Sequence, residues 1–171
     1  MTLQRIVELY KKCWKHCSDD EFTWFNQQPS LDKAIELAAF AFDEHRKRYP
    51  HQRKIRRDSL NRAYPKLQAS KTKIERCKDF DTLFGVIQES VADISGIGEL
   101  YIYDTVFRIG AKLNLQPDKV YLHSGTREGA KKLHLDFKAK ALELSQFPEE
   151  LQKLQANEIE DILCIYKDKF Q

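Results

Sequence analysis

Two glycines separated by one apolar residue, Gly96, Ile97 and Gly98, stand between two segments with helical patterning. Glycine adopts positive φ angles without steric cost and lets another group approach the backbone closely. The first amides of the following helix have no acceptor within that helix and lie at the positive end of its dipole. These residues therefore predict a turn that binds phosphate through its backbone. A tight corner between two packed helices needs the same glycines and is the alternative interpretation.

A second pair of glycines lies further along the chain, where Gly125 and Gly129 flank Thr126 and Arg127. We expect Gly125, Thr126 and Arg127 to form a second phosphate contact, ahead of a helix that begins near Thr126. The spacing differs from that of a Walker loop, because G-x-x-x-x-G-K-[ST] is absent. In the alternative, the glycines permit an ordinary turn and Thr126 caps the helix.

Proton transfer needs a titratable side chain, and His123 stands directly before this second pair of glycines. The sequence places no Ser or Cys nucleophile and no Asp partner at a spacing that would identify a catalytic set around it. His123 is therefore a candidate catalytic residue whose partner the sequence does not assign.

The positive charge of the chain is concentrated in residues 45–78. This segment has thirteen Lys and Arg residues against two acidic residues, a net charge of +11, whereas the whole chain has a net charge of +3. Such an excess repels itself unless a polyanion or an acidic surface lies against it. Arginine pairs well with phosphate oxygens through its planar fork, and Tyr49 and Tyr64 could stack on bases. We expect nucleic-acid contacts from Arg46, Lys47, Arg48, Arg53, Lys54, Arg56 and Arg57, the alternative being a solvated helical face.

The segment ISGIGELYIYDTV resembles the helix-hairpin-helix motif, in which Gly-hydrophobic-Gly joins two helices. The resemblance covers about two dozen residues and implies a turn that holds one DNA strand by its phosphates without reading the base sequence. It assigns that turn to Gly96, Ile97 and Gly98. Family members commonly have Lys, Arg, Ser or Thr within the three residues after the second glycine, whereas this chain continues with Glu99, Leu100 and Tyr101.

A second resemblance lies in YDTVFRIGAKLNL, which is similar to the segment around the catalytic aspartate of helix-hairpin-helix DNA glycosylases. It implies that Asp104 is a catalytic acid and that Arg108 is its structural neighbour. In those enzymes a full helix separates the hairpin from the aspartate, whereas Asp104 follows Gly98 by six residues. The residues themselves allow another interpretation, because Asp104, Arg108 and Lys112 recur every four positions, as in a ladder of ion pairs along one helix face. No set of iron–sulfur cysteines accompanies the segment.

The elements that would position these residues are helices, because apolar residues recur with helical spacing and almost none alternate with a period of two. The spacing predicts a first helix over about 2–17, ending at the polar stretch SDDEF, and a long helix from Pro29 to Pro50. It also predicts a last helix capped by Asn157. The fold class we expect is all-α, a compact bundle of short helices that contains a helix-hairpin-helix-like turn. We expect a single domain over residues 1–171, with a basic helical segment at 45–78 and a hairpin-containing half at 79–171.

The composition, 42% hydrophobic and 32% charged residues, is typical of a soluble globular protein. No apolar run approaches the roughly 18 residues that span a bilayer, and the first residues lack the features of a signal peptide, so we expect a cytoplasmic protein without membrane contact.

Cys13, His16 and Cys17 form the stretch CWKHC, but both cysteines continue an apolar helical stripe. We therefore expect both thiols in the core, no metal site and no cofactor.

These observations favour a non-catalytic nucleic-acid-binding protein, with DNA ahead of RNA as its partner. The basic strip from Arg46 to Arg57 would supply affinity that does not depend on base sequence. One alternative is an enzyme that acts on DNA or on a phosphorylated substrate, with Asp104, His123 and Arg127 in its site. Another is a protein-interaction module that binds an acidic partner.

Overall fold

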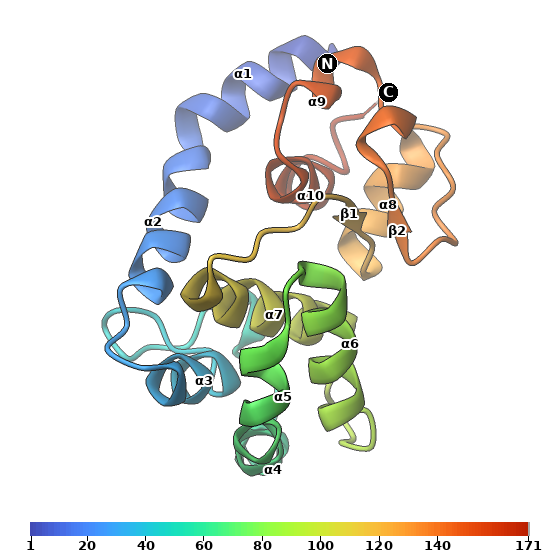
Figure 1. Ribbon diagram of the computed structural model, residues 1–171. Coiled ribbons are helices and arrows are strands. Elements are labelled where there is room, and N and C mark those ends of the chain that lie inside the picture. The colour runs from blue at the N-terminus through green and yellow to red at the C-terminus, as the bar shows by residue number, and fades with distance from the viewer. Residues whose placement is uncertain (171) are drawn as a thin grey trace. The chain divides into compact units, whose positions relative to one another are not determined.

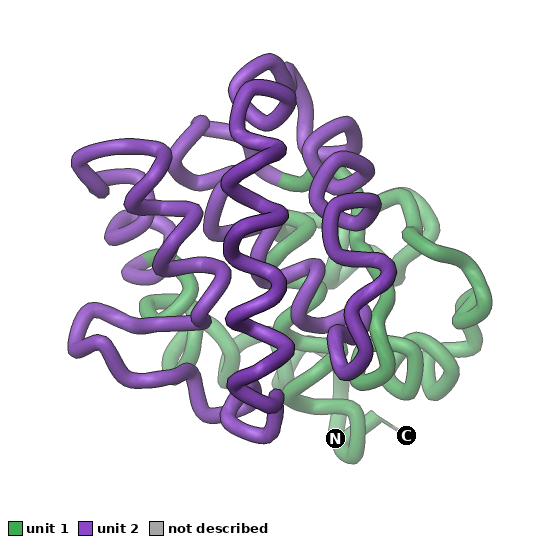
Figure 2. The backbone as a smooth tube through the Cα atoms, turned by 90° about the horizontal axis from the view of Figure 1, so that it is seen from below, with its two compact units in different colours: residues 1–19, 117–171 green, residues 20–116 purple. Residues whose placement is uncertain are grey.

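The computed structural model describes residues 1–170. The predicted all-α class is confirmed, because helices form nearly all the regular structure and the one sheet in the described chain has two short strands (Figure 1). The chain divides into two compact units (Figure 2): unit 1 comprises residues 1–19 and 117–171, and unit 2 comprises residues 20–116. The basic segment and the glycine turn therefore belong to the same unit. That the two units behave as a single domain stays a prediction.

Unit 2 is built around α7 (Glu99–Leu113), most of whose side chains are buried. The other helices of this unit are α3 (Leu31–Ala39), η1 (Pro50–Gln52), α4 (Arg57–Ala69), α5 (Lys71–Arg76) and α6 (Phe80–Val91), together with the second half of α2 (Lys15–Asn26). Both α3 and α6 pack against α7, and α4 packs against α3 and α6. Asp79 begins α6 by accepting the amide of Thr82 at 2.7 Å, and Asn114 ends α7 in a left-handed conformation.

Unit 1 contains the start of the chain and its last third. Its elements are α1 (Leu3–Cys13), β1 (Val120–Tyr121), α8 (Ser124–Lys132), β2 (Ala141–Leu142), η2 (Leu144–Gln146), α9 (Glu149–Gln152) and α10 (Ala156–Ile165), with the first residues of α2. β1 and β2 are antiparallel. α8 packs beside α10, and α1 contacts α9 and α10 (Figure 1). Ile6, Tyr10, Ile159 and Leu163 belong to the buried apolar cluster that joins them.

The long helix predicted from Pro29 to Pro50 is wrong beyond Ala39, where α3 ends. Asp43 explains the break, because its carboxylate accepts the amides of His45 at 2.9 Å and Lys47 at 2.8 Å, and so offers the backbone an alternative to the helix. Ala41 has a positive φ of 54°. The first part of the basic segment, up to the start of α4, is therefore loop and one 3-10 turn rather than helix.

The start of the chain also differs from the prediction. A break at Trp14 separates α1 from α2, and the polar stretch SDDEF lies inside α2 instead of ending a helix. This break moves the apolar stripe, so that Cys13 and Cys17 are exposed rather than in the core.

The cap predicted for the last helix is wrong by two residues. α10 begins after Gln155, whose backbone amide donates to the carboxylate of Glu158 at 2.8 Å, and Asn157 lies inside the helix. Within residues 1–170 no helix has the length and apolar character needed to cross a bilayer.

The close packing at the end of α7 gives a stability prediction. A Cβ atom on Gly110 would lie 2.8 Å from the carbonyl oxygen of Leu115, which the left-handed turn at Asn114 holds in place. Gly110→Ala should therefore lower the free energy of unfolding by about 1–3 kcal/mol, as overpacking does. Thermal and urea unfolding measure this change.

Gly85→Ala is the matched control, because Gly85 lies within α6 and a Cβ atom there meets nothing within 4 Å. This substitution should raise stability by about 0.5–1 kcal/mol, the usual difference between alanine and glycine inside a helix. Equal effects of the two substitutions would contradict the close approach at Gly110.

Candidate functional site

The turn between α6 and α7 presents backbone at the surface. Gly96 has a φ of +85°, a conformation that favours glycine, and both Gly96 and Gly98 are exposed. Gly98 is the extended residue that starts α7, it has no side-chain cap, and a Cβ atom there would meet nothing within 4 Å. The first amides of a fifteen-residue helix therefore open onto the surface at this turn. Phosphate binding by this turn stays a prediction.

The start of α4 lies directly against this turn. The hydroxyl of Ser59 donates to the carbonyl oxygen of Ser95 at 2.8 Å, and a Cβ atom on Gly96 would lie 3.1 Å from the Ser59 oxygen. Two turns further along α4, the ammonium of Lys66 pairs with Asp93 at 3.1 Å. The hydrogen bond from Lys66 lowers the pKa of Asp93 below its usual value, and the charge of Arg62 acts in the same direction. The basic helix and the glycine turn thus share one surface.

Four exposed cations lie just before and at the start of α4. Arg56 is the residue that precedes α4 and Arg57 is its first residue, so both lie within one helical turn of Ser59. Arg53, Lys54, Arg56 and Arg57 are exposed, and none forms an ion pair with another described residue. The Nε of Arg53 donates only to the carbonyl oxygen of Arg48, at 3.3 Å. These four predicted contact residues therefore have no ion pair among the described residues, and Arg56 and Arg57 are the two that lie within one helical turn of the Ser59 contact.

The remaining arginines of the predicted strip line a pocket of about 310 Å³ in the same unit. Arg46 and Arg48, from the loop after α3, meet Arg57, and the stacked rings of Phe40 and Phe42 complete the wall together with Glu36 and Asn61. Arg46 pairs with Glu36 at 3.5 Å, while Arg48 donates to the carbonyl oxygen of Ile55 at 2.7 Å. Lys47 is exposed in the same loop. The loop folds back, so arginines of the loop and of α4 lie around one pocket that two aromatic rings help to line.

Tyr49 and Tyr64, which the sequence offered as stacking residues, pack within unit 2. The ring of Tyr49 lies against the guanidinium of Arg108, whose Cζ is 4.0 Å from the ring centroid. Burial raises the pKa of the Tyr49 hydroxyl. The ring of Tyr64 lies against Phe40, with centroids 5.4 Å apart. Both side chains are half-buried.

Arg108 holds a polar cluster in the interior of unit 2. Its side chain is 1% exposed, its Nε donates to the carboxylate of Glu21 at 2.6 Å, and one of its terminal nitrogens donates to the side-chain amide oxygen of Gln52 at 3.1 Å. The predicted ion pair of Arg108 with Asp104 is present, with a terminal guanidinium nitrogen 3.9 Å from the carboxylate. The predicted ladder of Asp104, Arg108 and Lys112 packs against other elements, however, and does not face solvent. Lys112, its third member, donates to the carbonyl oxygens of Asn26 and Gln28.

Asp104 connects this buried cluster to an exposed histidine. Its carboxylate lies 2.8 Å from Nε2 of His51 and also accepts a hydrogen bond from the side-chain amide of Gln52. The His51 side chain is 45% exposed, whereas that of Asp104 is 15% exposed. A carboxylate that orients an accessible imidazole is an arrangement used for proton transfer. The sequence did not predict this pair, because the two residues lie 53 positions apart and no spacing connects them.

The second predicted phosphate contact lies in unit 1, at the start of α8. Gly125 is half-buried and Thr126 is buried, with the Thr126 hydroxyl accepting the amide of His123 at 2.7 Å. Arg127 donates to the carbonyl oxygens of Phe137 and Ala139, at 2.9 and 2.7 Å. The helix begins at Ser124 after His123 as its N-cap, earlier than predicted, and Thr126 is its third residue, whose hydroxyl binds back to the amide of His123. A phosphate contact here stays a prediction.

His123 lies in the interior of unit 1, and its Nε2 is 2.5 Å from the carboxylate of Glu160. The sequence gave no partner for this histidine because the partner is a glutamate on α10, 37 positions away. Asp104 belongs to unit 2, whereas His123 and Arg127 belong to unit 1. The three residues named for a catalytic alternative therefore come from two different units.

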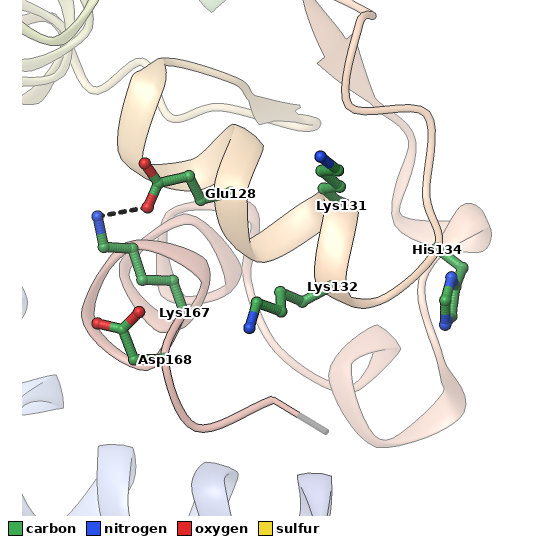
Figure 3. A pocket seen from close by; sticks show the side chains of 6 residues that line it. All are labelled: Glu128, Lys131, Lys132, His134, Lys167 and Asp168. Atoms are coloured by element: carbon green, nitrogen blue, oxygen red, sulfur yellow. Dashed lines mark ion pairs between the residues drawn. The ribbon is translucent and has the colours of Figure 1, made fainter.

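Three lysines of unit 1 line a pocket further along α8 and near the end of the chain. A pocket of about 480 Å³ is lined by Lys131, Lys132 and Lys167 together with His134, Glu128 and Asp168 (Figure 3). Glu128 pairs with Lys167 at 2.7 Å, and this hydrogen bond lowers the pKa of the carboxyl group. Lys131 and Lys132 are exposed, so unit 1 also presents positive charge at its surface.

Comparisons of the chain with models of protein families, with curated proteins and with solved structures find no match. The assignment of a function therefore depends on the geometry of the residues described above.

Proposed function

We propose that unit 2 binds the phosphate backbone of a nucleic acid, DNA ahead of RNA, through the glycine turn at residues 96–98 and the basic residues that precede and begin α4. The observation that carries the proposal is the contact between Ser59 and Ser95, which puts the start of α4 beside the turn. Backbone amides and arginine side chains on one surface are the two kinds of donor that phosphates accept most often from proteins.

Charge supports the same surface. Arg53, Lys54, Arg56 and Arg57 are exposed and have no acidic partner among the described residues, so they repel one another. A row of phosphates relieves this repulsion and releases the counterions condensed on the nucleic acid. Because none of these contacts requires a base edge, the binding should be independent of sequence.

The first test measures fluorescence anisotropy of labelled single- and double-stranded DNA and RNA over a series of salt concentrations. The logarithm of affinity should fall linearly with the logarithm of salt concentration. The variant Arg53→Ala/Arg56→Ala/Arg57→Ala should reduce the slope by about 2 to 3, because each phosphate contact contributes about 0.9.

Lys131→Ala/Lys132→Ala/Lys138→Ala is the matched control, since it removes three exposed cations from unit 1. It should leave the slope nearly unchanged. A loss of binding in the lysine variant alone would move the site to unit 1. No binding to any nucleic acid at low salt would overturn the proposal and would favour an acidic protein partner for the basic segment.

A second test addresses the glycine turn separately. Glu99 is the exposed first residue of α7 and follows Gly98 directly, so its negative charge belongs to the start of the helix beside the turn. Glu99→Lys should therefore tighten nucleic-acid binding, by about tenfold at low salt, because it replaces repulsion with an additional phosphate contact.

Glu149→Lys makes the same change of charge at the exposed first residue of α9 in unit 1. This control should change affinity much less, although it changes the net charge equally. If both variants tighten binding to the same extent, the effect comes from net charge and the turn at residues 96–98 does not contact the phosphate.

A second candidate function, chemistry on the bound nucleic acid, is favoured by the pair of His51 and Asp104. Our proposal of binding alone expects that incubation of labelled DNA with the protein, followed by alkali, yields no strand break. It also expects Asp104→Asn to retain wild-type affinity. A product that forms with the wild type and is lost in both Asp104→Asn and His51→Gln, with affinity retained, would show catalysis by this pair.

A further inference from the structure

Three side chains with different donor atoms converge in unit 1. His123 precedes α8, while Glu160 and Cys164 lie one turn apart on the same face of α10. One nitrogen of His123, one carboxylate oxygen of Glu160 and the sulfur of Cys164 all lie within 4.8 Å of one another. His123 and Glu160 are buried, and Cys164 is half-buried.

Two glycines of α8 allow α10 to come this close. A Cβ atom on Gly125 would lie 3.0 Å from the sulfur of Cys164, and one on Gly129 would overlap the backbone carbonyl of Leu163. The Thr126 hydroxyl accepts the amide of His123 and so fixes the histidine backbone at the start of α8. The pair of glycines that the sequence offered as an anion site thus brings the thiol of Cys164 next to the imidazole of His123.

The neighbouring acidic residues of this part of α10 have hydrogen-bond partners of an ordinary kind. Glu158 pairs with Lys15 at 2.5 Å, and the hydrogen bond raises the pKa of that lysine. Asp161 accepts the hydroxyl of Tyr10 at 2.7 Å. Glu160 instead faces a histidine and a cysteine, the two side chains that most often bind zinc in proteins.

We propose that His123, Glu160 and Cys164 form a binding site for a divalent metal ion of the zinc class. The donor set of nitrogen, carboxylate oxygen and thiolate sulfur suits a borderline-soft ion and is unsuitable for calcium or magnesium. A thiolate and a carboxylate carry two negative charges, which a divalent ion neutralises. The loaded site would therefore bury no net charge.

Loading requires a small rearrangement. In the structure Nε2 of His123 and the Glu160 carboxylate are 2.5 Å apart, the separation of a hydrogen bond. Two ligands on one tetrahedral zinc ion are about 3.3 Å apart, from metal–ligand distances of about 2.0–2.1 Å. The metal ion thus takes the place of the proton between His123 and Glu160, and these two ligand atoms move apart by a further distance of less than one ångström. The Cys164 thiol releases its proton to solvent as the sulfur binds the metal ion. Three protein ligands leave a fourth position for water or another small ligand.

The test is a titration of the untagged, full-length protein with Co²⁺, which replaces zinc in such sites. We expect one equivalent to bind and to produce an absorption band of thiolate-to-cobalt charge transfer in the near ultraviolet. Cys164→Ser should abolish this band and weaken binding at least tenfold, and Zn²⁺ should displace the bound cobalt. Zn²⁺ should also raise the melting temperature of the wild type but not that of Cys164→Ser.

Cys13→Ser/Cys17→Ser is the control for adventitious binding, because these two exposed thiols flank His16, whose Nε2 is 3.4 Å from the Cys17 sulfur. This variant should keep the band and the affinity. Absence of a thiolate band in the wild type overturns the proposal whether or not Cys164→Ser folds. A band that disappears in the control and persists in Cys164→Ser overturns it as well.

Discussion

The buried guanidinium of Arg108 is the constraint on which unit 2 depends. A guanidinium stays protonated at all accessible pH values, so its burial is tolerable only when acceptors surround it. Glu21 comes from α2, Gln52 from η1 and Asp104 from α7 itself, while the ring of Tyr49 covers the face of the guanidinium. The residue that the sequence identified as part of a surface ladder is therefore the point at which three separate segments are joined.

This arrangement also places the functional surface. Tyr49, His51 and Gln52 belong to the first part of the basic segment, and their contacts with Arg108 and Asp104 attach that segment to α7. At the other end of α7, its first residue follows the glycine turn that Ser59 contacts. Among the cations of the basic segment, Arg46, Lys66 and Lys71 pair with acidic residues, whereas Arg53, Lys54, Arg56 and Arg57 have no such partner in the described chain.

The sequence was informative where local rules decide the structure. Helical periodicity predicted the fold class. A pair of glycines located the turn before α7, because the φ of +85° at position 96 is free of strain only for a glycine. Local rules failed where a side chain competes with the helix, as Asp43 does after α3. They also failed where partners are distant in sequence. Nothing in the spacing of His123 and Glu160, or of His51 and Asp104, indicates that these pairs lie within hydrogen-bond distance.

The composition of unit 1 has a consequence for the order in which the chain folds. Unit 2 is one continuous stretch, so all its contacts are available once residue 116 has been synthesised. Unit 1 must join the first residues to the last, as in the hydrogen bond between Tyr10 and Asp161, which are 151 positions apart. Contacts of such long separation form late. The apolar face of α1, with Ile6 and Val7, therefore lacks its partners in α9 and α10 while unit 2 is synthesised, and the nascent chain carries this exposed surface during that time.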